Sequence, residues 1–425
     1  MSAAITVPSS VRETIACQRT PPEDRPVTTY REVFADGEFR ALFAANAAVV
    51  AGMTMQMLAL SALVYASTGS PLLAALAYLG GYLPLAIGAL TLLSLADRVR
   101  PRAFLAAWDG VRALAAITFA VGVLPTWAIL AIVMAMGLLE AVAGAVRNAL
   151  IVDILSTGGF VLGRSTFNVS VGAMQIIGFA VGGTLIAAIG PHPALFAGAA
   201  FMVVSAVLTR FGLRRRAPRV AGRAGLRETW HGTRVLWRDP AIRALLLALW
   251  LPNGIIVGAE AMYVPYAGSS AGILFIAAAL GMLAGDVVVG RWVPPGRLDR
   301  LITPLQTLLA VPYLIFVFHP GTWLAAGAVA VASFGFAAAL GLQRRLLDAM
   351  PEELRGQGLG LDSSGRMTLQ AIGAFAVGSL AEAFGPAAAM TGAAVGSLLI
   401  VALLWRPLRR TGIVAFGHPA PSAVS

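Results

Sequence analysis

Six charged side chains interrupt long apolar stretches of the chain: Asp109, Arg112, Glu140, Glu260, Asp286 and Glu382. Moving a charge out of water is costly, so each of them needs a partner or a function. Asp109 and Arg112 are spaced i,i+3, so on a helix they can pair with each other. Glu140 has no basic residue within one helical turn along the chain. A carboxylate in apolar surroundings favours its protonated form, which makes Glu140 a candidate for binding and releasing a proton.

The composition indicates what surrounds these charges. Of the 425 residues, 58% are hydrophobic and only 12% are charged, and the mean hydropathy is +0.81. One soluble core of this length cannot hide so many apolar side chains, so the sequence predicts an integral membrane protein. The single cysteine, Cys17, lies in a polar N-terminal segment, so we expect neither a disulfide framework nor a metal site, and no cofactor.

Apolar stretches of about twenty residues, the length that crosses a bilayer as a helix, occur twelve times. The predicted spans are 41–66, 72–95, 103–123, 126–147, 166–189, 193–211, 241–265, 269–290, 301–318, 321–342, 363–384 and 387–405. The fold class predicted from them is an all-α membrane protein with twelve transmembrane helices. The expected domains are a flexible tail 1–38, a six-helix half 39–212, a basic linker 213–240, a second half 241–405 and a tail 406–425.

The basic residues predict the orientation in the membrane. All of them are arginines, and apart from Arg112 they fall in the tails and in every second connection between spans, while the other connections contain none. Basic residues are retained on the cytoplasmic side of the cell membrane. The sequence therefore predicts that both termini and the linker are cytoplasmic. Topology and anionic lipid account for the net charge of +11, so we expect no nucleic-acid partner.

A glycine-rich segment occurs twice. GFAVGGTLIAAIGP, which starts at Gly178, returns 195 positions later as GAFAVGSLAEAFGP, which starts at Gly373. The matched segments lie in spans five and eleven, so the repeat unit is six helices and the two halves are pseudo-symmetric. Glycines here can let helices of opposite halves approach closely, although ordinary small-residue packing would also use them. The predicted helix-packing glycines are Gly178, Gly182, Gly183, Gly373 and Gly378.

Three motifs resemble the major facilitator superfamily, and within it the macrolide-efflux-like drug exporters. VYASTGSPLLAALAYLGGYLP, from Val64 to Pro84, is similar to the passage between the first two spans of that branch. LADRVRPR, from Leu95 to Arg102, resembles the cytoplasmic loop motif of the superfamily. GFAVGG resembles the antiporter motif of span five, with Phe179 in place of its proline. The resemblance covers residues 39–405 and implies two halves that rock around a central site.

The resemblance implies roles for the charged residues. Spans four and seven line the central cavity in this fold, so Glu140 and Glu260 are the proton-coupling candidates. A pairing of Glu140 with Arg112 would instead give Glu140 a structural role. A cytoplasmic latch between the halves is expected from the loop motif and the charges near it: Asp97, Arg98, Arg102, Asp109, Arg112 and Asp286.

The substrate cavity is expected on spans one and seven. Met53 and Gln56 belong to a methionine cluster that offers an adaptable surface to bulky apolar molecules, and Asn253 and Tyr263 lie on span seven. Core packing is the alternative use of such a cluster. The sequence contains no phosphate-binding loop, so ATP hydrolysis is not expected as the energy source.

These features predict a monomeric, proton-coupled exporter of a hydrophobic small molecule, such as an antibiotic or secondary metabolite, in the cell membrane. An importer or siderophore carrier of the same fold is the alternative. A membrane enzyme or receptor that does not transport is a more distant one, because no cluster of catalytic residues is apparent. We therefore predict that the chain is not an enzyme and that its partners are its substrate, protons and the lipid bilayer.

Overall fold

The computed structural model describes residues 30–92, 95–96, 98–155, 157–218, 233–351 and 354–414, and its regular elements there are helices. The first half contains α2 (Tyr30–Val33), α3 (Gly37–Thr68), α4 (Pro71–Leu79), α5 (Tyr82–Thr91), α6 (Pro101–Val121), α7 (Thr126–Ile154), α8 (Thr157–Ile189) and α9 (Pro191–Gly212). The second contains α11 (Pro240–Glu260), α12 (Tyr263–Ala267), η2 (Gly268–Ser270), α13 (Ala271–Trp292), α14 (Pro295–Ala310), η3 (Val311–Phe318), α15 (Thr322–Phe334), η4 (Gly335–Ala337), α16 (Ala338–Ala349), α17 (Arg355–Phe384) and α18 (Pro386–Val414).

Eleven segments of the described residues are long and apolar enough to cross a membrane. One of them, Pro240–Trp292, is 53 residues long and contains both α11 and α13. These two helices have 21 and 22 residues, and each is long enough to span a bilayer by itself. The all-helical membrane fold is confirmed, and the predicted count of twelve corresponds to counting α11 and α13 separately.

Four predicted spans are interrupted. Span seven breaks between the end of α11 at Glu260 and the start of α12 at Tyr263. Span two is divided into α4 and α5 at Gly80 and Gly81, span nine changes from α14 to the 3₁₀ helix η3, and span ten contains η4. A Cβ atom added to Gly81 would lie 3.4 Å from the carbonyl oxygen of Val133, so α5 begins where its backbone packs against α7. Pro312 follows the start of η3 and cannot donate a backbone hydrogen bond, which favours a change of helix type there.

Side-chain caps and glycine turns set several helix ends. The Asp36 carboxylate accepts hydrogen bonds from the amides of Glu38 and Phe39 at 2.6 and 3.1 Å and so caps α3. Asp239 caps α11 in the same way, with bonds of 2.7 and 3.2 Å. At its other end α3 stops at Gly69, whose φ of 68° lies in the left-handed region that glycine adopts without strain.

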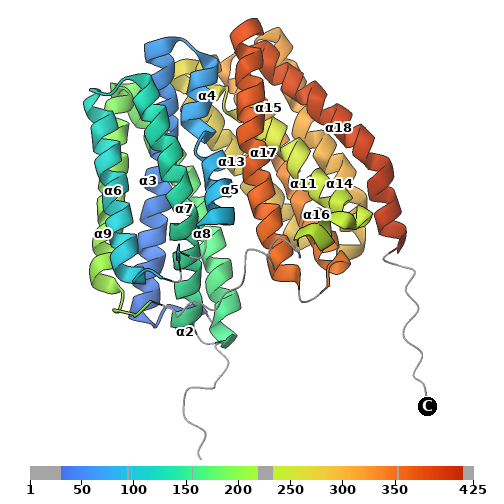
Figure 1. Cartoon of the computed structure of the whole chain (residues 1–425). Helices are drawn as coiled ribbons and strands as arrows, with labels where there is room; N and C mark the ends of the chain where they lie inside the picture. The colour runs from blue at the N-terminus through green and yellow to red at the C-terminus, as the bar shows by residue number, and fades with distance from the viewer. Residues whose placement is uncertain are drawn as a thin grey trace, which may run out of the picture.

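The two halves meet at two main contacts. In the first, α4 and α5 pack on α17, and in the second, α8 packs on α13. In Figure 1 the blue-to-green first half lies beside the yellow-to-red second half. We call the end of the bundle at which α3 turns into α4, α8 into α9, η2 into α13 and α17 into α18 the distal end; the glycines of these turns are Gly69, Gly190, Gly268 and Gly385.

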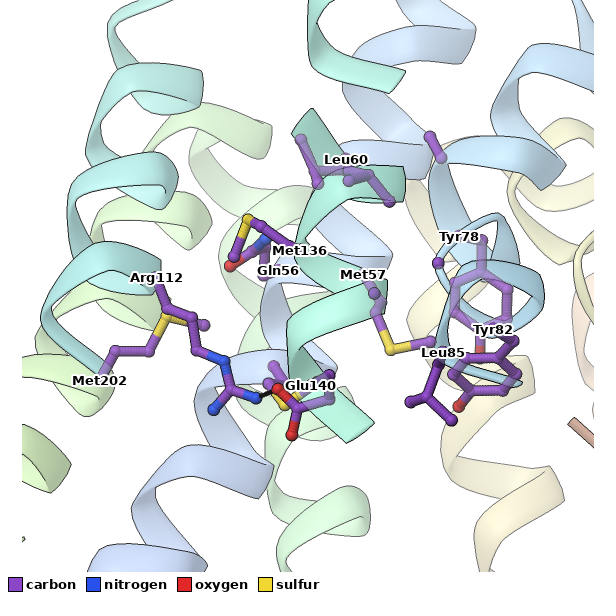
Figure 2. A pocket seen from close by; sticks show the side chains of 15 residues that line it. Gln56, Met57, Leu60, Tyr78, Tyr82, Leu85, Arg112, Met136, Glu140 and Met202 are labelled. Atoms are coloured by element: carbon purple, nitrogen blue, oxygen red, sulfur yellow. Dashed lines mark ion pairs between the residues drawn. The ribbon is translucent and has the colours of Figure 1, made fainter. Parts of the chain in front are cut away.

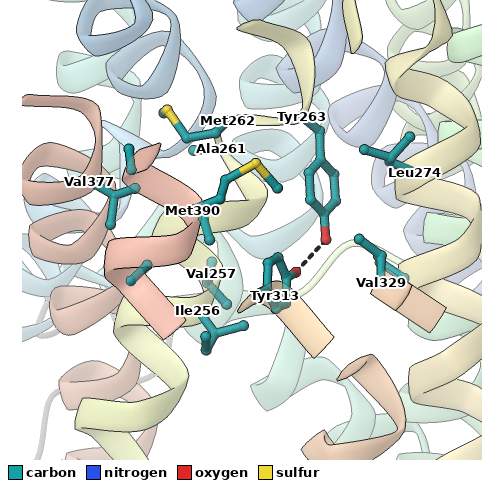
Figure 3. Close-up of a cluster of buried hydrophobic side chains, with 14 of the residues drawn as sticks. Ile256, Val257, Ala261, Met262, Tyr263, Leu274, Tyr313, Val329, Val377 and Met390 are labelled. Carbon is teal, nitrogen blue, oxygen red and sulfur yellow. Dashed lines mark hydrogen bonds between the residues drawn. The ribbon is translucent and has the colours of Figure 1, made fainter. Parts of the chain in front are cut away.

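The core is continuous across these contacts. A large buried cluster joins Tyr78 of α4 to residues of the second half that include Tyr263, Phe275 and Tyr313. Figure 3 shows the part of this cluster around α11 and η3. The halves are therefore held together by apolar packing as well as by the chain that connects them.

Parts of the predicted domain plan fall outside the described residues. This applies to residues 1–29 of the N-terminal tail, to residues 219–232 of the basic linker and to residues 415–425 at the C-terminus. Two predicted tails are partly helical where they are described, because α3 already begins at Gly37 and α18 continues to Val414.

Candidate functional site

A network of buried charges lies inside the first half. Arg112 of α6 donates a hydrogen bond to Asp109 at 3.2 Å, and the two side chains are only 2% and 1% exposed. Arg112 also forms an ion pair with Glu140 of α7. Trp108 donates its indole N–H to the same carboxylate at 3.1 Å. The structure thus brings three of the predicted charges together and pairs Glu140 with Arg112, the alternative that the sequence had left open.

Asp109 has further partners on two other helices. The Ser205 hydroxyl of α9 donates to its second oxygen at 2.6 Å, and Arg147 of α7 lies 3.9 Å from its first. Two arginines therefore face two carboxylates, Asp109 and Glu140, so the formal charges of the network cancel. The network links α6, α7 and α9, which makes it part of the internal packing of this half.

A pocket of about 90 Å³ opens beside the Arg112–Glu140 pair. Figure 2 shows that pair on one side of the pocket and Tyr78, Tyr82 and Met57 toward the other. Its lining includes the predicted cavity residues Met53 and Gln56, and further methionines: Met57, Met136 and Met202. Unbranched methionine side chains adapt to ligands of different shapes. The pocket therefore combines an adaptable apolar wall with a single pair of opposite charges.

The other two predicted cavity residues do not line this pocket. Tyr263 is fully buried, and its hydroxyl lies 2.5 Å from that of Tyr313, as Figure 3 shows. Asn253 accepts a hydrogen bond from the Gln370 amide at 2.8 Å. In this conformation both side chains therefore serve contacts between helices of the second half.

Glu260 is the last residue of α11, and its environment differs from that of Glu140. Its Oε1 atom is buried and has no hydrogen-bond partner among the described residues. Four tyrosines lie close enough for electrostatic interaction with it: Tyr78, Tyr82, Tyr263 and Tyr313. Tyr78 and Tyr82 also line the pocket, and Tyr78, Tyr263 and Tyr313 belong to the large buried cluster that joins the halves.

The remaining predicted latch residues do not gather at one site. Asp97 lies outside the described residues, and Arg98 is exposed. Arg102 donates to the Leu213 carbonyl at 3.2 Å, which joins the start of α6 to the end of α9. Asp286 of α13 is exposed and has no ion pair with any described residue. A contact between the two halves through these residues stays a prediction.

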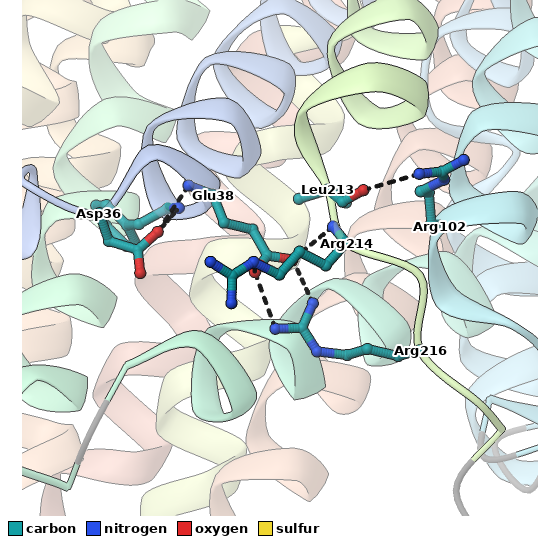
Figure 4. A network of polar contacts seen from close by, with 7 residues as sticks. Asp36, Glu38, Arg102, Leu213, Arg214 and Arg216 are labelled. Atoms are coloured by element: carbon teal, nitrogen blue, oxygen red, sulfur yellow. Dashed lines mark hydrogen bonds and ion pairs between the residues drawn. The ribbon is translucent and has the colours of Figure 1, made fainter.

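A second polar cluster anchors the start of the linker. Glu38 accepts a hydrogen bond from the Arg214 amide at 2.9 Å and forms an ion pair with Arg216 (Figure 4). The bond to the Glu38 carboxylate raises the pKa of the Arg216 guanidinium above its usual value. The linker therefore leaves the first half from a fixed point at the N-terminus of α3.

The repeated glycines fall into two groups. Gly183 and Gly378 lie between the halves: an added Cβ atom would be 2.6 Å from the Cα of Gly272 in the first case and 3.0 Å from the Cα of Leu72 in the second. Gly178 and Gly182 pack against α3, and Gly373 packs against α11, each within its own half. Only the first group mediates close approach across the halves.

Sequence comparison decides the family. The model of the Major Facilitator Superfamily matches residues 42–342, which is more than half of the chain. The chain belongs to the major facilitator superfamily. It is a membrane transporter of this type. No curated relative matches it by sequence, and the macrolide-efflux-like branch stays a prediction.

Solved structures of transporters of this superfamily share the fold. An inward-facing, unoccupied bacterial homologue of the human lysosomal transporter Spinster has a TM-score of 0.69 at 15% identity, covering 92% of this chain and 100% of that one. The nucleoside transporter NupG has a TM-score of 0.68 at 12% identity, covering 87% and 99%. A peptide transporter bound to sulfate has a TM-score of 0.67 at 14% identity, covering 91% and 99%.

Sequence reasoning missed several residues of the site. Arg147 lies two helical turns from Glu140 on α7, so a search at i,i+7 spacing could have placed it on the same face. Ser205 carried no comparable signal, because a serine within an apolar helix is common. Tyr78, Tyr82 and Tyr313 come from three different segments, and only the folded chain brings them within electrostatic range of Glu260.

Proposed function

We propose that this superfamily member exports a hydrophobic small molecule, such as an antibiotic or secondary metabolite, in exchange for protons. The observation that carries the proposal is the buried Oε1 of Glu260, which has no hydrogen-bond partner among the described residues and lies within electrostatic range of two tyrosines that line the methionine-rich pocket. Uphill transport needs an energy source, and a carboxylate that is protonated in one conformation and deprotonated in another can couple transport to the proton gradient.

Of the two predicted proton carriers, the contacts favour Glu260. Glu140 is held by Arg112 and Trp108, and an adjacent arginine stabilises the charged form of a carboxylate. Glu260 forms no ion pair among the described residues. No arginine of this part of the chain therefore stabilises its deprotonated form through an ion pair. Glu140 remains the second candidate for the coupling role.

The closed distal end fits one state of an alternating-access cycle. Gly183 against Gly272 and Gly378 against Leu72 bring the halves together at that end. The Glu382 carboxylate accepts a hydrogen bond from the Leu72 amide at 3.4 Å beside the second contact. With the termini in the cytoplasm, as the arginines predict, this seam closes the path to the outside and the conformation is ready to load substrate from the cytoplasm.

One observation favours import as a second candidate. Phe179 takes the place of the proline in the motif that resembles antiporters, and its ring stacks on Phe275 of α13 with centroids 4.7 Å apart. At the position where the antiporter motif has its proline kink, this chain therefore has an aromatic contact between the halves. The motif that indicates export is incomplete, which favours import.

Purified protein in sealed vesicles separates the two directions of transport. With the cytoplasmic face outward and a pH difference imposed, an exporter accumulates a hydrophobic fluorescent compound inside only when protons can flow out. Accumulation that requires the substrate and protons to move in the same direction contradicts the proposal and supports the importer. Vesicles with the protein but without a pH difference are the control.

A further inference from the structure

Glu260 differs from the other buried acidic groups in having no donor. Asp109 bonds to Arg112 and Ser205, Glu140 bonds to Trp108 and pairs with Arg112, and Asp362 accepts a hydrogen bond from Trp250 at 3.2 Å. In the described part of the chain the buried Oε1 of Glu260 has none of these. A desolvated carboxylate without a donor is neutralised either by a proton or by a positively charged ligand.

Among the described residues of the elements packed around α11, no positive side chain forms an ion pair with Glu260. On α17, Arg366 lies 3.6 Å from Asp362, and Glu382 at the distal end is itself an acid. On α14 and α16, Asp299 is paired with Arg344 and Arg345. The Arg112 guanidinium in the pocket is already held by two carboxylates. In the described part of the chain, no ion pair therefore balances a charge on Glu260.

Tyrosines of both halves lie within electrostatic range of this carboxylate. Tyr78 and Tyr82 belong to the first half, and Tyr263 and Tyr313 to the second. The hydroxyls of Tyr263 and Tyr313 bond to one another, and the Phe275 ring lies 5.2 Å from that of Tyr78 and 4.8 Å from that of Tyr263. The faces of such rings carry negative potential and attract organic cations. A carboxylate near aromatic rings is suited to a bulky ammonium group more than to a small hydrated ion.

We propose that the exported molecule is an amphipathic organic cation whose charge binds at Glu260. This rests on the proposed function, which it makes more specific. The apolar body of the molecule occupies the methionine-lined pocket, whose lining residues Tyr78 and Tyr82 are within electrostatic range of Glu260. A proton and the cation then compete for one carboxylate, so each conformation carries one or the other. Exchange of one proton for one monovalent cation follows.

Binding to the purified full-length protein tests this without transport. The probes are tetraphenylphosphonium and ethidium, which keep their charge at all relevant pH values, with triphenylphosphine oxide as an uncharged relative. The native protein is expected to bind at least one cation more tightly at pH 8 than at pH 6, to release about one proton per cation bound in weakly buffered solution, and to bind the uncharged relative no better at pH 8.

Matched variants assign the charge to one residue. Glu260→Gln is expected to weaken cation binding by tenfold or more and to abolish the proton release, whereas Glu260→Asp keeps both in part. Asp348→Asn also neutralises a carboxylate, at an exposed position of α16, and is expected to leave binding unchanged. Proton release by the native protein needs no variant, so it remains informative if Glu260→Gln does not fold.

Three results overturn the inference: neither cation binds the native protein, binding releases no proton, or Glu260→Gln binds as the native protein does. Failure of the proposed function looks different. Cation binding with proton release, but without pH-driven export, leaves the cation site standing and removes proton-coupled export. Proton-driven export of an uncharged compound without any cation binding removes the cation site and leaves proton-coupled export standing.

Discussion

At the scale of single residues, the charges inside the first half form a balanced set. Arg112 lies between Asp109 and Glu140, and Arg147 and Ser205 complete the surroundings of Asp109. Each group is stable in the interior because its neighbours compensate it. Removing one member leaves an uncompensated buried charge, whereas removing an oppositely charged pair does not.

Arg112→Gln is therefore expected to destabilise the protein by about 3–5 kcal/mol, because two carboxylates lose their buried partner. The double variant Arg112→Gln with Glu140→Gln is expected to recover a large part of this loss. Thermal unfolding in detergent measures both. Arg98→Gln, at an exposed position, serves as the control. A double variant that is as unstable as the sum of the two single variants would contradict the pairing.

At the scale of helices, the contact between the halves depends on backbone approach. The Cβ atom of a residue other than glycine at position 183 or 378 would meet the backbone of the opposite half. On the same helices, Gly172 of α8 and Gly360 of α17 have open space where a Cβ atom would lie. These two positions are matched controls for the effect of side-chain volume.

Gly183→Val and Gly378→Val are expected to force the distal ends apart and to shift the population away from the distally closed conformation. Gly172→Val and Gly360→Val are expected to leave it unchanged. Distances between spin labels on the exposed ends of α8 and α13 report the separation in each variant. Equal distance distributions in all four variants would show that the glycines do not control closure.

The helices were more predictable from the sequence than the site. Bilayer thickness fixes the length of a span, so apolar length alone located the membrane helices. The break at Gly80 and Gly81 was not predictable, because it depends on the packing of α5 against α7. The partners of Glu140 were not predictable either. Sequence periodicity shows which residues of one helix share a face, whereas Arg112 and Trp108 lie on a different helix from Glu140. Nothing in the sequence around Tyr263 indicated that its side chain would be buried with its hydroxyl against that of Tyr313.

At the scale of the whole molecule, the orientation in the membrane remains a prediction from the arginines. A reporter fused after Arg216 is expected to lie in the cytoplasm, and one inserted at Gly69 outside it. Paired alkaline phosphatase and green fluorescent protein fusions measure both positions, since the first is active only outside and the second fluoresces only inside. Reversed signals at either position would overturn the twelve-span topology.

The whole-molecule account also requires that substrate movement and proton movement can be separated. If Glu260 couples them, its neutral replacement still lets the halves alternate around a bound substrate, because the protonated form is mimicked. For an uncharged substrate, which does not need the cation site, only the use of the proton gradient is lost. Loss of folding or of substrate entry would instead reduce every form of transport together.

The most direct test compares uphill export with exchange in the same vesicles. Glu260→Gln is expected to exchange an internal for an external uncharged hydrophobic substrate at a rate near that of the native protein, while accumulation driven by an imposed pH difference falls by about tenfold or more. An uncharged substrate is used so that loss of the cation site does not affect the reading. If Glu260→Gln accumulates substrate as the native protein does, Glu260 is not the coupling residue and the central claim is wrong.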